Sequence, residues 1–293
     1  MMILVHGGAG QVTPDRHDRL RGGVRAAAQA GANVLGRGGS ALDAVVAAVR
    51  VLEDDPEFGA GVGSALTQDG TVETCASVMD GARRKAGAVA AVQDLAQPVI
   101  VARAALEIGE HVILAGIGAQ RYASEIGLTA APAGSLVTPR SAAVHREAQA
   151  KGVKAIASEG GGVGAVACDQ QGNLAAATST GGTVFRRAGC VDDSCVPGIG
   201  TWADGEVAIS TSGGEALFRV ALAKDVAARV AAGTGLRKAV KESLVELKRL
   251  ASEDVAGVIA VTKDSWVALQ LGPAMPVGWV DKFGLNDAIG FEV

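Results

Sequence analysis

Two glycine-rich stretches of the sequence hold the groups best suited to chemistry. The first, HGGAG at residues 6–10, exposes backbone N–H groups that can bind an oxyanion or a substrate. The second, residues 161–182, ends in three hydroxyl side chains at 178–180, followed by Gly181 and Gly182. Hydroxyls held at the end of a strand can serve as nucleophiles. Each stretch also has a structural interpretation, as a tight strand-to-helix turn and as two plain core strands.

The other reactive side chains do not fall into a known catalytic spacing. The four histidines lack a metal-ligand spacing: His6, His17, His111 and His145. The sequence has no H-E-x-x-H zinc motif, no G-x-S-x-G nucleophile elbow, no P-loop and no dinucleotide fingerprint after a strand. These absences argue against a metallohydrolase, a serine hydrolase, an NTPase and a dehydrogenase.

The spacing of the cysteines also predicts neither a metal site nor a redox motif. None has the paired spacing of a zinc ribbon or a redox motif: Cys75, Cys168, Cys190 and Cys195. Cys190 and Cys195 are close enough in sequence for a local disulfide. Two ordinary thiols are the favoured interpretation.

Composition sets the broad class. The chain has 293 residues, 48% of them hydrophobic, which excludes intrinsic disorder. With 27 basic and 31 acidic residues and no basic block, dedicated nucleic-acid binding is not expected. The sequence has neither a signal-peptide pattern at its start nor a membrane-length apolar run, so we expect a cytoplasmic protein with no membrane association. Glycine is abundant at 41 residues, which suits tight turns and closely packed layers.

Hydrophobic periodicity predicts the elements that position these groups. A buried strand is expected at 3–5, directly before the glycine turn. Helices are expected at 15–35, 41–53, 98–108, 119–126, 139–150, 215–231 and 236–251. Hairpins are expected around turns at 68–70 and 170–172, with further strands at 207–211, 256–261 and 266–271, the last two closing the chain. Ser40 should cap the helix over 41–53, with Asp43 completing a short capping box.

This order places helices around antiparallel hairpins rather than in strict β–α–β alternation. It predicts an α+β fold with helical layers covering mainly antiparallel sheet. No repeat or polar linker divides the chain, so we expect a single domain in two halves, 1–161 and 162–293. The seam is expected at 151–162, where helical patterning stops.

The combination of motifs resembles the plant-type L-asparaginase and isoaspartyl peptidase family of N-terminal-nucleophile hydrolases. The resemblance covers nearly the whole chain, in the family's order. It is carried by HGGAG (6–10), LEDDPEFGAGVG (52–63), VMDG (78–81), KAGAVA (85–90), the hairpin at 161–182, GCVDDSCVPGIGTWAD (189–204) and TSGGE (211–215). It implies a four-layer αββα sandwich and a homodimer.

The resemblance also implies a mechanism. The family's precursor cuts itself before a threonine, whose freed hydroxyl attacks an aspartyl amide or β-aspartyl peptide with its own α-amino group as base. Thr180 matches the second threonine beside that nucleophile. Asp193 matches the acid that binds the substrate amine. Thr211 matches the oxyanion-hole threonine, and Gly214 a substrate-contacting backbone position.

No catalytic cofactor is implied, but a structural sodium ion is. Its family loop is wrapped around the ion by backbone carbonyl groups, which suit a hard cation. The matching positions are Leu52, Glu53, Asp55, Phe58, Ala60 and Val62. The alternative for this segment is a helix end that leads into a glycine turn without a metal.

Several positions depart from the family pattern. Gly162 stands where the nucleophilic threonine belongs, and without a hydroxyl it can neither cleave the chain nor form an acyl-enzyme. Cys190 replaces the arginine that grips the substrate carboxylate, and a thiol cannot make that bidentate pair. Gly59 replaces an expected substrate-site asparagine, and Ser212 replaces the oxyanion-hole glycine. The linker before residue 162 also looks shorter than the family's.

These departures leave several functions open. One change at Gly162 would fit an engineered, unprocessed precursor, whereas four changes and a short linker favour a natural, uncleaved relative that has lost the standard chemistry. The first hypothesis is a hydrolase of aspartyl amides or β-aspartyl dipeptides, diverged or blocked at its nucleophile. The alternatives are a small-molecule-binding relative and a scaffold. Cys190 could be a replacement nucleophile if its pKa were lowered, and an inert thiol is the favoured interpretation.

Overall fold

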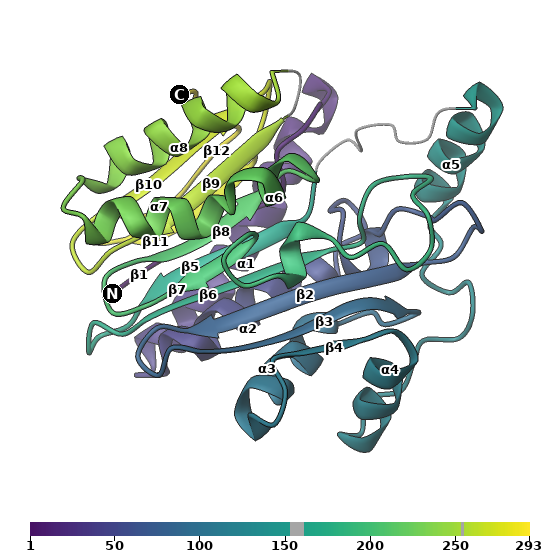
Figure 1. The fold of residues 1–293 in the computed structure, drawn as a ribbon, viewed down its shortest axis with the longest axis horizontal. Coiled ribbons are helices and arrows are strands. Elements are labelled where there is room, and N and C mark those ends of the chain that lie inside the picture. Colours follow the sequence, from purple (N-terminus) through teal and green to yellow (C-terminus); the bar gives the residue numbers. More distant parts are fainter. Residues whose placement is uncertain (153–160, 253–254) are drawn as a thin grey trace.

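The computed structural model describes residues 1–152, 161–252 and 255–293, and its larger sheet runs through the centre of the molecule (Figure 1). The order of its eight strands is β12–β11–β1–β5–β6–β2–β3–β4. Their bounds are β1 (Met2–His6), β2 (Glu73–Asp80), β3 (Lys85–Gln93), β4 (Ile113–Ala115), β5 (Val163–Cys168), β6 (Leu174–Thr180), β11 (Val277–Asp281) and β12 (Gly284–Ala288). The sheet therefore takes strands from both sides of residue 161.

A second sheet of four strands packs against the first. Its order is β10–β9–β8–β7. The bounds are β7 (Thr201–Ala203), β8 (Ala208–Ser212), β9 (Ala256–Val261) and β10 (Trp266–Leu271). A shared core fills the space between the sheets, with Leu4 and Val166 from one side and Ile259 and Val261 from the other.

Helices cover the outer faces of both sheets (Figure 1). On the larger sheet lie α1 (His17–Gly36), α2 (Ala41–Glu53), α3 (Pro98–Ile108) and α4 (Gly116–Glu125). On the smaller sheet lie α6 (Ala216–Val220), α7 (Leu222–Ala231) and α8 (Leu236–Leu250). Helix α5 (Pro139–Lys151) and three short 3₁₀ turns, at Pro14–Arg16, Gly61–Gly63 and Asp193–Cys195, complete the described elements.

The α+β class predicted from the sequence is confirmed. The helix over 41–53 has the predicted bounds, and the Ser40 hydroxyl accepts the backbone N–H of Asp43 at 3.1 Å. The hairpin around 170–172 is also confirmed as β5 and β6. None of the helices among the described residues is long and apolar enough to cross a bilayer.

Three local predictions are wrong. The turn at 68–70 closes only an isolated bridge between Leu66 and Val72, because β2 pairs with β3 instead. The helix predicted over 215–231 is broken at Ala221, which has a left-handed φ of 49°. Strands β11 and β12 follow the two that were expected to close the chain. Residues 153–160 of the predicted seam lie outside the described residues.

Candidate functional site

Gly162 immediately precedes β5 and lies opposite the end of β6. In the register of this hairpin Val163 pairs with Ser179, so the next pair outward is Gly162 and Thr180. A Cβ atom on Gly162 would lie 2.7 Å from the Ser179 carbonyl oxygen and 3.0 Å from Thr180 Oγ1. The Thr180 hydroxyl therefore lies beside the position that a side chain of residue 162 would occupy.

The glycine turn after β1 packs against the backbone before Gly162. Gly8 has φ +93°, and any Cβ there would overlap the backbone of Gly161. The Gly161 N–H donates to the Ala9 carbonyl at 3.3 Å, and the Ala9 N–H donates to Ser212 Oγ at 2.9 Å. The turn thus needs small residues because two backbones meet in it. It brings HGGAG, the start of β5 and the end of β8 together.

Ser212 and Thr211 point to opposite sides of β8. Ser212 Oγ faces Ala9 and would lie 2.6 Å from a Cβ on Gly161. The Thr211 hydroxyl instead donates to the Ile199 carbonyl at 3.1 Å. This is the alternation expected of neighbouring strand residues. Gly214 follows β8 with open space beside it. Of the two predicted oxyanion-hole positions, it is the Ser212 side chain that faces the Gly161–Gly162 backbone.

The turn after β6 connects Thr180 to the predicted substrate position Gly59. Thr180 Oγ1 accepts the Gly182 N–H at 2.9 Å, and the Gly181 N–H donates to the Gly59 carbonyl at 2.7 Å. The guanidinium of Arg186, a buried residue, lies beneath this turn and donates to the Gly181 carbonyl at 2.5 Å. Sequence reasoning did not single out Arg186. Its burial comes from loop packing, which leaves no local pattern.

Asp193 is a buried acid at the start of the 3₁₀ turn Asp193–Cys195. Its Oδ2 atom has no hydrogen-bond partner among the described residues. Burial first, and then the neighbouring Asp192 carboxylate, raise the pKa of Asp193 well above its usual range. A carboxyl group in this state can gain a partner when a cation binds beside it.

Cys190 is half-buried in the same loop. Its Sγ lies 3.8 Å from Glu215 Oε1 at the start of α6. Burial and the Glu215 and Asp192 carboxylates raise the pKa of the Cys190 thiol. This is the reverse of the environment that activates a cysteine. All four cysteines are free thiols, so no disulfide links Cys190 and Cys195.

A buried chain of hydroxyls runs between the two sheets from the glycine turn to the Asp193 loop. His6 Nδ1 accepts the Gly8 N–H at 3.3 Å, so Nε2 carries the proton and donates to Ser210 Oγ at 3.0 Å. Ser210 and Thr178 are joined at 2.7 Å, and Thr201 donates to Thr178 at 2.6 Å.

Beyond Thr201 the chain ends at the Asp193 loop. The Ser77 hydroxyl lies 2.7 Å from Thr201 Oγ1 and 2.6 Å from the Ser194 carbonyl. Burial lowers the pKa of His6 to about 3, which keeps the ring neutral. Sequence reasoning did not find this network, because His6 and Ser210 are 204 residues apart.

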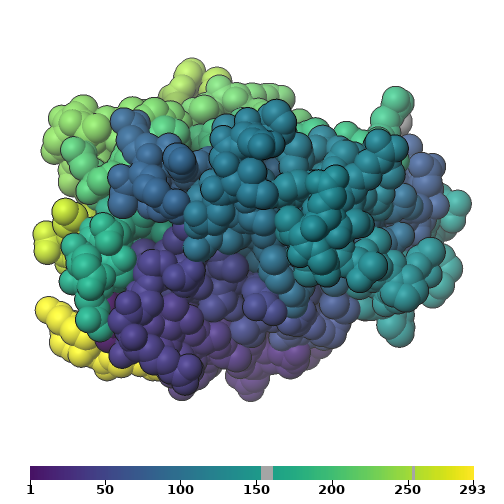
Figure 2. Space-filling model, turned by 90° about the horizontal axis from the view of Figure 1, so that it is seen from below, coloured from purple at the N-terminus to yellow at the C-terminus, as the bar shows by residue number. Residues whose placement is uncertain are grey.

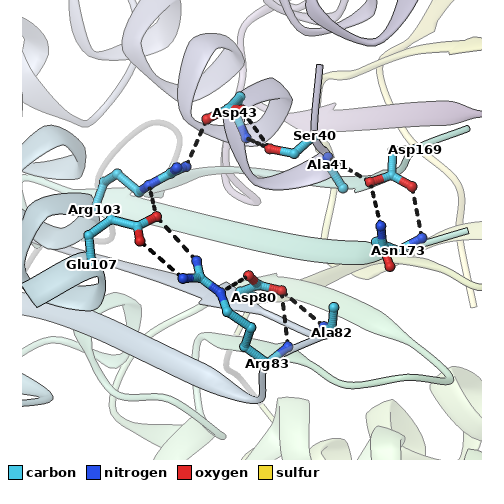
Figure 3. Close-up of polar contacts among 10 residues, drawn as sticks. All are labelled: Ser40, Ala41, Asp43, Asp80, Ala82, Arg83, Arg103, Glu107, Asp169 and Asn173. Carbon is cyan, nitrogen blue, oxygen red and sulfur yellow. Dashed lines mark hydrogen bonds and ion pairs between the residues drawn. The ribbon is translucent and has the colours of Figure 1, made fainter. Parts of the chain in front are cut away.

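The hairpin that carries Gly162 and Thr180 is anchored at its other end by Asp169 (Figure 3). Asp169 Oδ1 accepts the Asn173 N–H at 2.8 Å, and Oδ2 accepts the Ala41 N–H at 3.3 Å at the start of α2. Beside this turn an ion-pair chain joins α2, α3 and β2 through Asp43, Arg103, Glu107, Arg83 and Asp80 (Figure 3). The Asp169–Ala41 contact joins the hairpin to the start of α2, and the ion pairs join α2 to α3 and to the end of β2.

The loop after α2 gathers backbone carbonyl oxygens around glycines. A Cβ on Gly61, whose φ is +53°, would overlap the Glu53 carbonyl and approach the Ala96 carbonyl at 2.5 Å. A Cβ on Gly63 would overlap the Phe58 carbonyl. The Glu53 side chain is buried as well, and its Oε2 has no partner among the described residues. Backbone carbonyl oxygens and carboxyl oxygens are the ligand types that a hard cation prefers, and both types occur in this loop.

Glu53 also contacts the hairpin. Its Oε1 accepts the Ser179 hydroxyl at 2.6 Å and the Val99 N–H at 3.1 Å. Burial raises the pKa of Glu53 to about 8. In the described residues no three His, Cys, Asp or Glu side chains converge as a metal site, so a cation here would depend on main-chain oxygens.

Comparison with known proteins decides the family. A family model described as asparaginase matches residues 1–280. The chain belongs to this asparaginase family. A Bos taurus protein named isoaspartyl peptidase/L-asparaginase is 41% identical over 300 residues, which cover 99% of this chain and 96% of that protein. A Homo sapiens protein of the same name is 42% identical, covering 94% of this chain and 91% of that protein.

A bacterial protein has a similar sequence identity to this chain. The Salmonella typhimurium protein named isoaspartyl peptidase is 39% identical over 285 residues, covering 92% of this chain and 91% of that protein. Family membership therefore extends over both sheets and over every residue of the site described above.

Proposed function

We propose that this chain is a hydrolase of the L-asparaginase and isoaspartyl peptidase class, acting on aspartyl amides or β-aspartyl dipeptides. The observation that carries the proposal is the juxtaposition of Gly162 with Thr180, beside the Gly8–Ala9 turn and Ser212. The names of relatives that match over more than 90% of the chain support it. The four-layer αββα arrangement inferred for this fold supports it further.

Thr180 supplies the attacking hydroxyl in this proposal. Gly162 has none, and among the described residues the hydroxyl nearest to its missing side chain is that of Thr180. The Thr180 oxygen adds to the amide carbonyl and the carbon–nitrogen bond breaks. The hydroxyl proton leaves on the departing amine or ammonia, and water then hydrolyses the aspartyl ester. The backbone N–H groups of the glycine turn are the candidate donors to the oxyanion.

Asp193 reads the substrate's α-amino group. The positive charge of the substrate ammonium, placed beside the unpartnered Oδ2, stabilises the ionised form of this buried carboxyl group. Gly59 and Gly214 form the backbone walls. Cys190 gives the substrate carboxylate no cationic partner, so binding of this group is weaker than an arginine would make it.

The loop Leu52–Val62 holds a structural sodium ion in the proposed form. Its ligands are the main-chain oxygens of the predicted positions: Leu52, Glu53, Asp55, Phe58, Ala60 and Val62. The ion supplies positive charge beside Glu53 and fixes the loop that contacts Gly181 through Gly59. It takes no part in the bond-breaking step.

The proposed form is an uncleaved chain that acts as a homodimer. Without a hydroxyl at residue 162 the self-cleavage that produces two chains does not occur. The cytoplasmic location stays a prediction of the sequence.

A second candidate function is ligand binding without turnover. It is favoured by the missing hydroxyl of Gly162 and by the thiol of Cys190 at the position where the family has an arginine. It predicts that aspartyl compounds stabilise the protein against heat while no product is released.

The two candidates are separated by a substitution at Thr180. We expect Thr180→Ala to abolish ammonia release from L-asparagine and amine release from β-aspartyl dipeptides. Thr183→Ala, three residues along the same turn, is the matched control and should keep wild-type rates. Thermal stabilisation by these compounds without any release would favour the binding candidate. Release that survives Thr180→Ala would overturn the role of Thr180.

A further inference from the structure

Carboxylate groups lie around Cys190 in the proposed substrate site. The Cys190 Sγ atom lies 3.8 Å from Glu215 Oε1 at the start of α6. The backbone N–H of Gly189 donates to Glu73 Oε2 at 2.8 Å, so a second carboxylate lies beside the residue that precedes Cys190. Asp192 adds a third, because its charge acts on the Cys190 thiol together with that of Glu215. The surroundings of this thiol are therefore acidic.

The nearby cation of Arg186 is held away from the site. Its charge also acts on the Cys190 thiol, but less strongly than that of Glu215. Arg186 is buried, and its guanidinium donates to the Gly181 carbonyl at 2.5 Å and to the Glu73 carbonyl at 2.7 Å. Its Nε atom is buried without a partner among the described residues, so a ligand cannot reach it unless the turn after β6 moves. Arg186 is thus fixed by main-chain acceptors and is not presented to a substrate carboxylate.

The wall beside Cys190 is open. Cys190 is half-buried, and its neighbour Val191 is 44% exposed. A Cβ atom on Gly189 or on Gly214 would meet no atom of the described residues within 4 Å. Glu215 is exposed as well. A group larger than a carboxylate, continuing outward from the α-carbon of a substrate, therefore has room on this side.

Asp193, in the same loop, keeps the requirement for a free amine. Its Oδ2 atom is buried and has no partner among the described residues. The Asp192 carboxylate acts on both the Asp193 carboxyl group and the Cys190 thiol, so one negative charge influences both positions. When Asp193 binds the α-amino group, the α-carboxyl group on the same carbon atom faces the acidic surroundings of Cys190. The loop then attracts the amine and repels a carboxylate.

We infer that the site selects aspartyl amides whose α-carboxyl group is itself blocked as an amide, as in an asparagine residue at the N-terminus of a peptide. The inference rests on the proposed function for the placement of the substrate. An α-carboxamide is neutral, so it avoids the repulsion that a carboxylate meets beside Glu215, and its N–H groups are donors that carboxylates accept.

The rest of the peptide leaves the site through the opening at Gly189 and Gly214. The bond that breaks is still the side-chain amide. One water molecule is consumed and one ammonia molecule is released, and the peptide then begins with aspartate. The preference concerns only which α-substituent the site accepts.

Binding measured by calorimetry tests the preference separately from turnover. The ligands are L-asparagine, L-asparagine α-amide and the amide of the dipeptide asparaginyl-alanine, at a pH below the pKa of all three amines, so that each carries an ammonium group. We expect the wild type to bind both amides at least about tenfold more tightly than L-asparagine.

Substitutions assign the preference to the residues around Cys190. Cys190→Arg should reverse the order, because L-asparagine gains a cationic partner. Glu215→Gln should narrow the difference, because it removes one repelling charge. Glu125→Gln is the matched control and should keep the wild-type difference, since Glu125 is exposed on α4, in the teal part of the face shown in Figure 2. Far-UV spectra check that each variant is folded.

Three results would overturn the inference. These are binding of L-asparagine by the wild type as tightly as the amides, binding of none of the three ligands, and a difference that Glu125→Gln removes as fully as Glu215→Gln. The proposed function is judged by ammonia release. Preferential binding of the amides without release would support the inference and count against the hydrolase, whereas release without a preference would do the reverse.

Discussion

A side chain at residue 162 would have two separate effects, a steric one from its Cβ atom and a chemical one from any hydroxyl that it carries. A Cβ there would lie 2.7 Å from Ser179 O and from Thr180 Cβ, so the ends of β5 and β6 must move apart to accept it. We expect both Gly162→Thr and Gly162→Ala to lower the free energy of unfolding by roughly 1–3 kcal/mol.

The two substitutions should differ in processing. Only Gly162→Thr restores a hydroxyl, so only this variant should convert to two chains, cut before residue 162. Intact mass over time measures the conversion. If Gly162→Thr is folded but remains one chain, the groups around residue 162 are not arranged as in a self-cleaving precursor.

Asp193 makes amine binding depend on pH. Because its pKa is raised, the free protein holds the group protonated over a wider pH range. An ammonium ligand pairs with the ionised form, so binding releases a proton and affinity should increase as pH rises, below the pKa of the ligand amine. Calorimetry of L-asparagine binding at several pH values measures this. Asp193→Asn should bind weakly with a flat profile, and a flat wild-type profile would remove Asp193 from the amine site.

At the scale of elements, the hydroxyl chain between the sheets holds both walls of the site. Thr178 bonds to Ser210, to Thr201 and to the Gly200 carbonyl. Thr178→Val keeps the shape but removes one hydrogen-bond partner from each of these three buried groups. We expect the free energy of unfolding to fall by about 2–3 kcal/mol, measured by urea denaturation.

Thr178→Ser is the matched control for this network. It retains the hydroxyl and loses one methyl group, which should cost about 1 kcal/mol. Equal stability of Thr178→Val and the wild type would show that the chain of hydroxyls contributes nothing to the coupling of the two sheets.

The elements that could be predicted from sequence are those with local signals. Helix α2 has a capping serine and a long apolar run, and β5–β6 has a polar glycine turn between two runs of small apolar residues. β3 lacks such a signal, since its strand is rich in alanine and includes Ala91 with φ +48°. The helix break at Ala221 also had no signal in the sequence, because alanine rarely adopts the left-handed conformation.

The site could be predicted only through the family resemblance. The positions of Thr180, Gly162 and Ser212 come from motifs, and the structure places their backbones together. The orientation of Thr211 away from Gly161 was not foreseen, because it depends on which face of β8 meets the glycine turn. His6, Ser210 and Arg186 were missed since their contacts cross between distant segments.

For the whole molecule, the sheet binds both halves of the chain together. β5 is paired with β1 on one side and with β6 on the other, so the strand after residue 161 is held on both sides whether or not the chain is continuous. The same strand pairing would keep the backbone around Gly162 in place in an uncleaved chain. We propose that the chain performs the chemistry of its family without being cleaved.

The most direct measurement is ammonia release from L-asparagine together with intact mass on the same sample. We expect turnover by a single chain of 29.2 kDa, no turnover by Thr180→Ala, and unchanged turnover by Thr183→Ala. Absence of turnover in a sample that retains its full mass would contradict it. Turnover confined to a small cleaved fraction would contradict it equally.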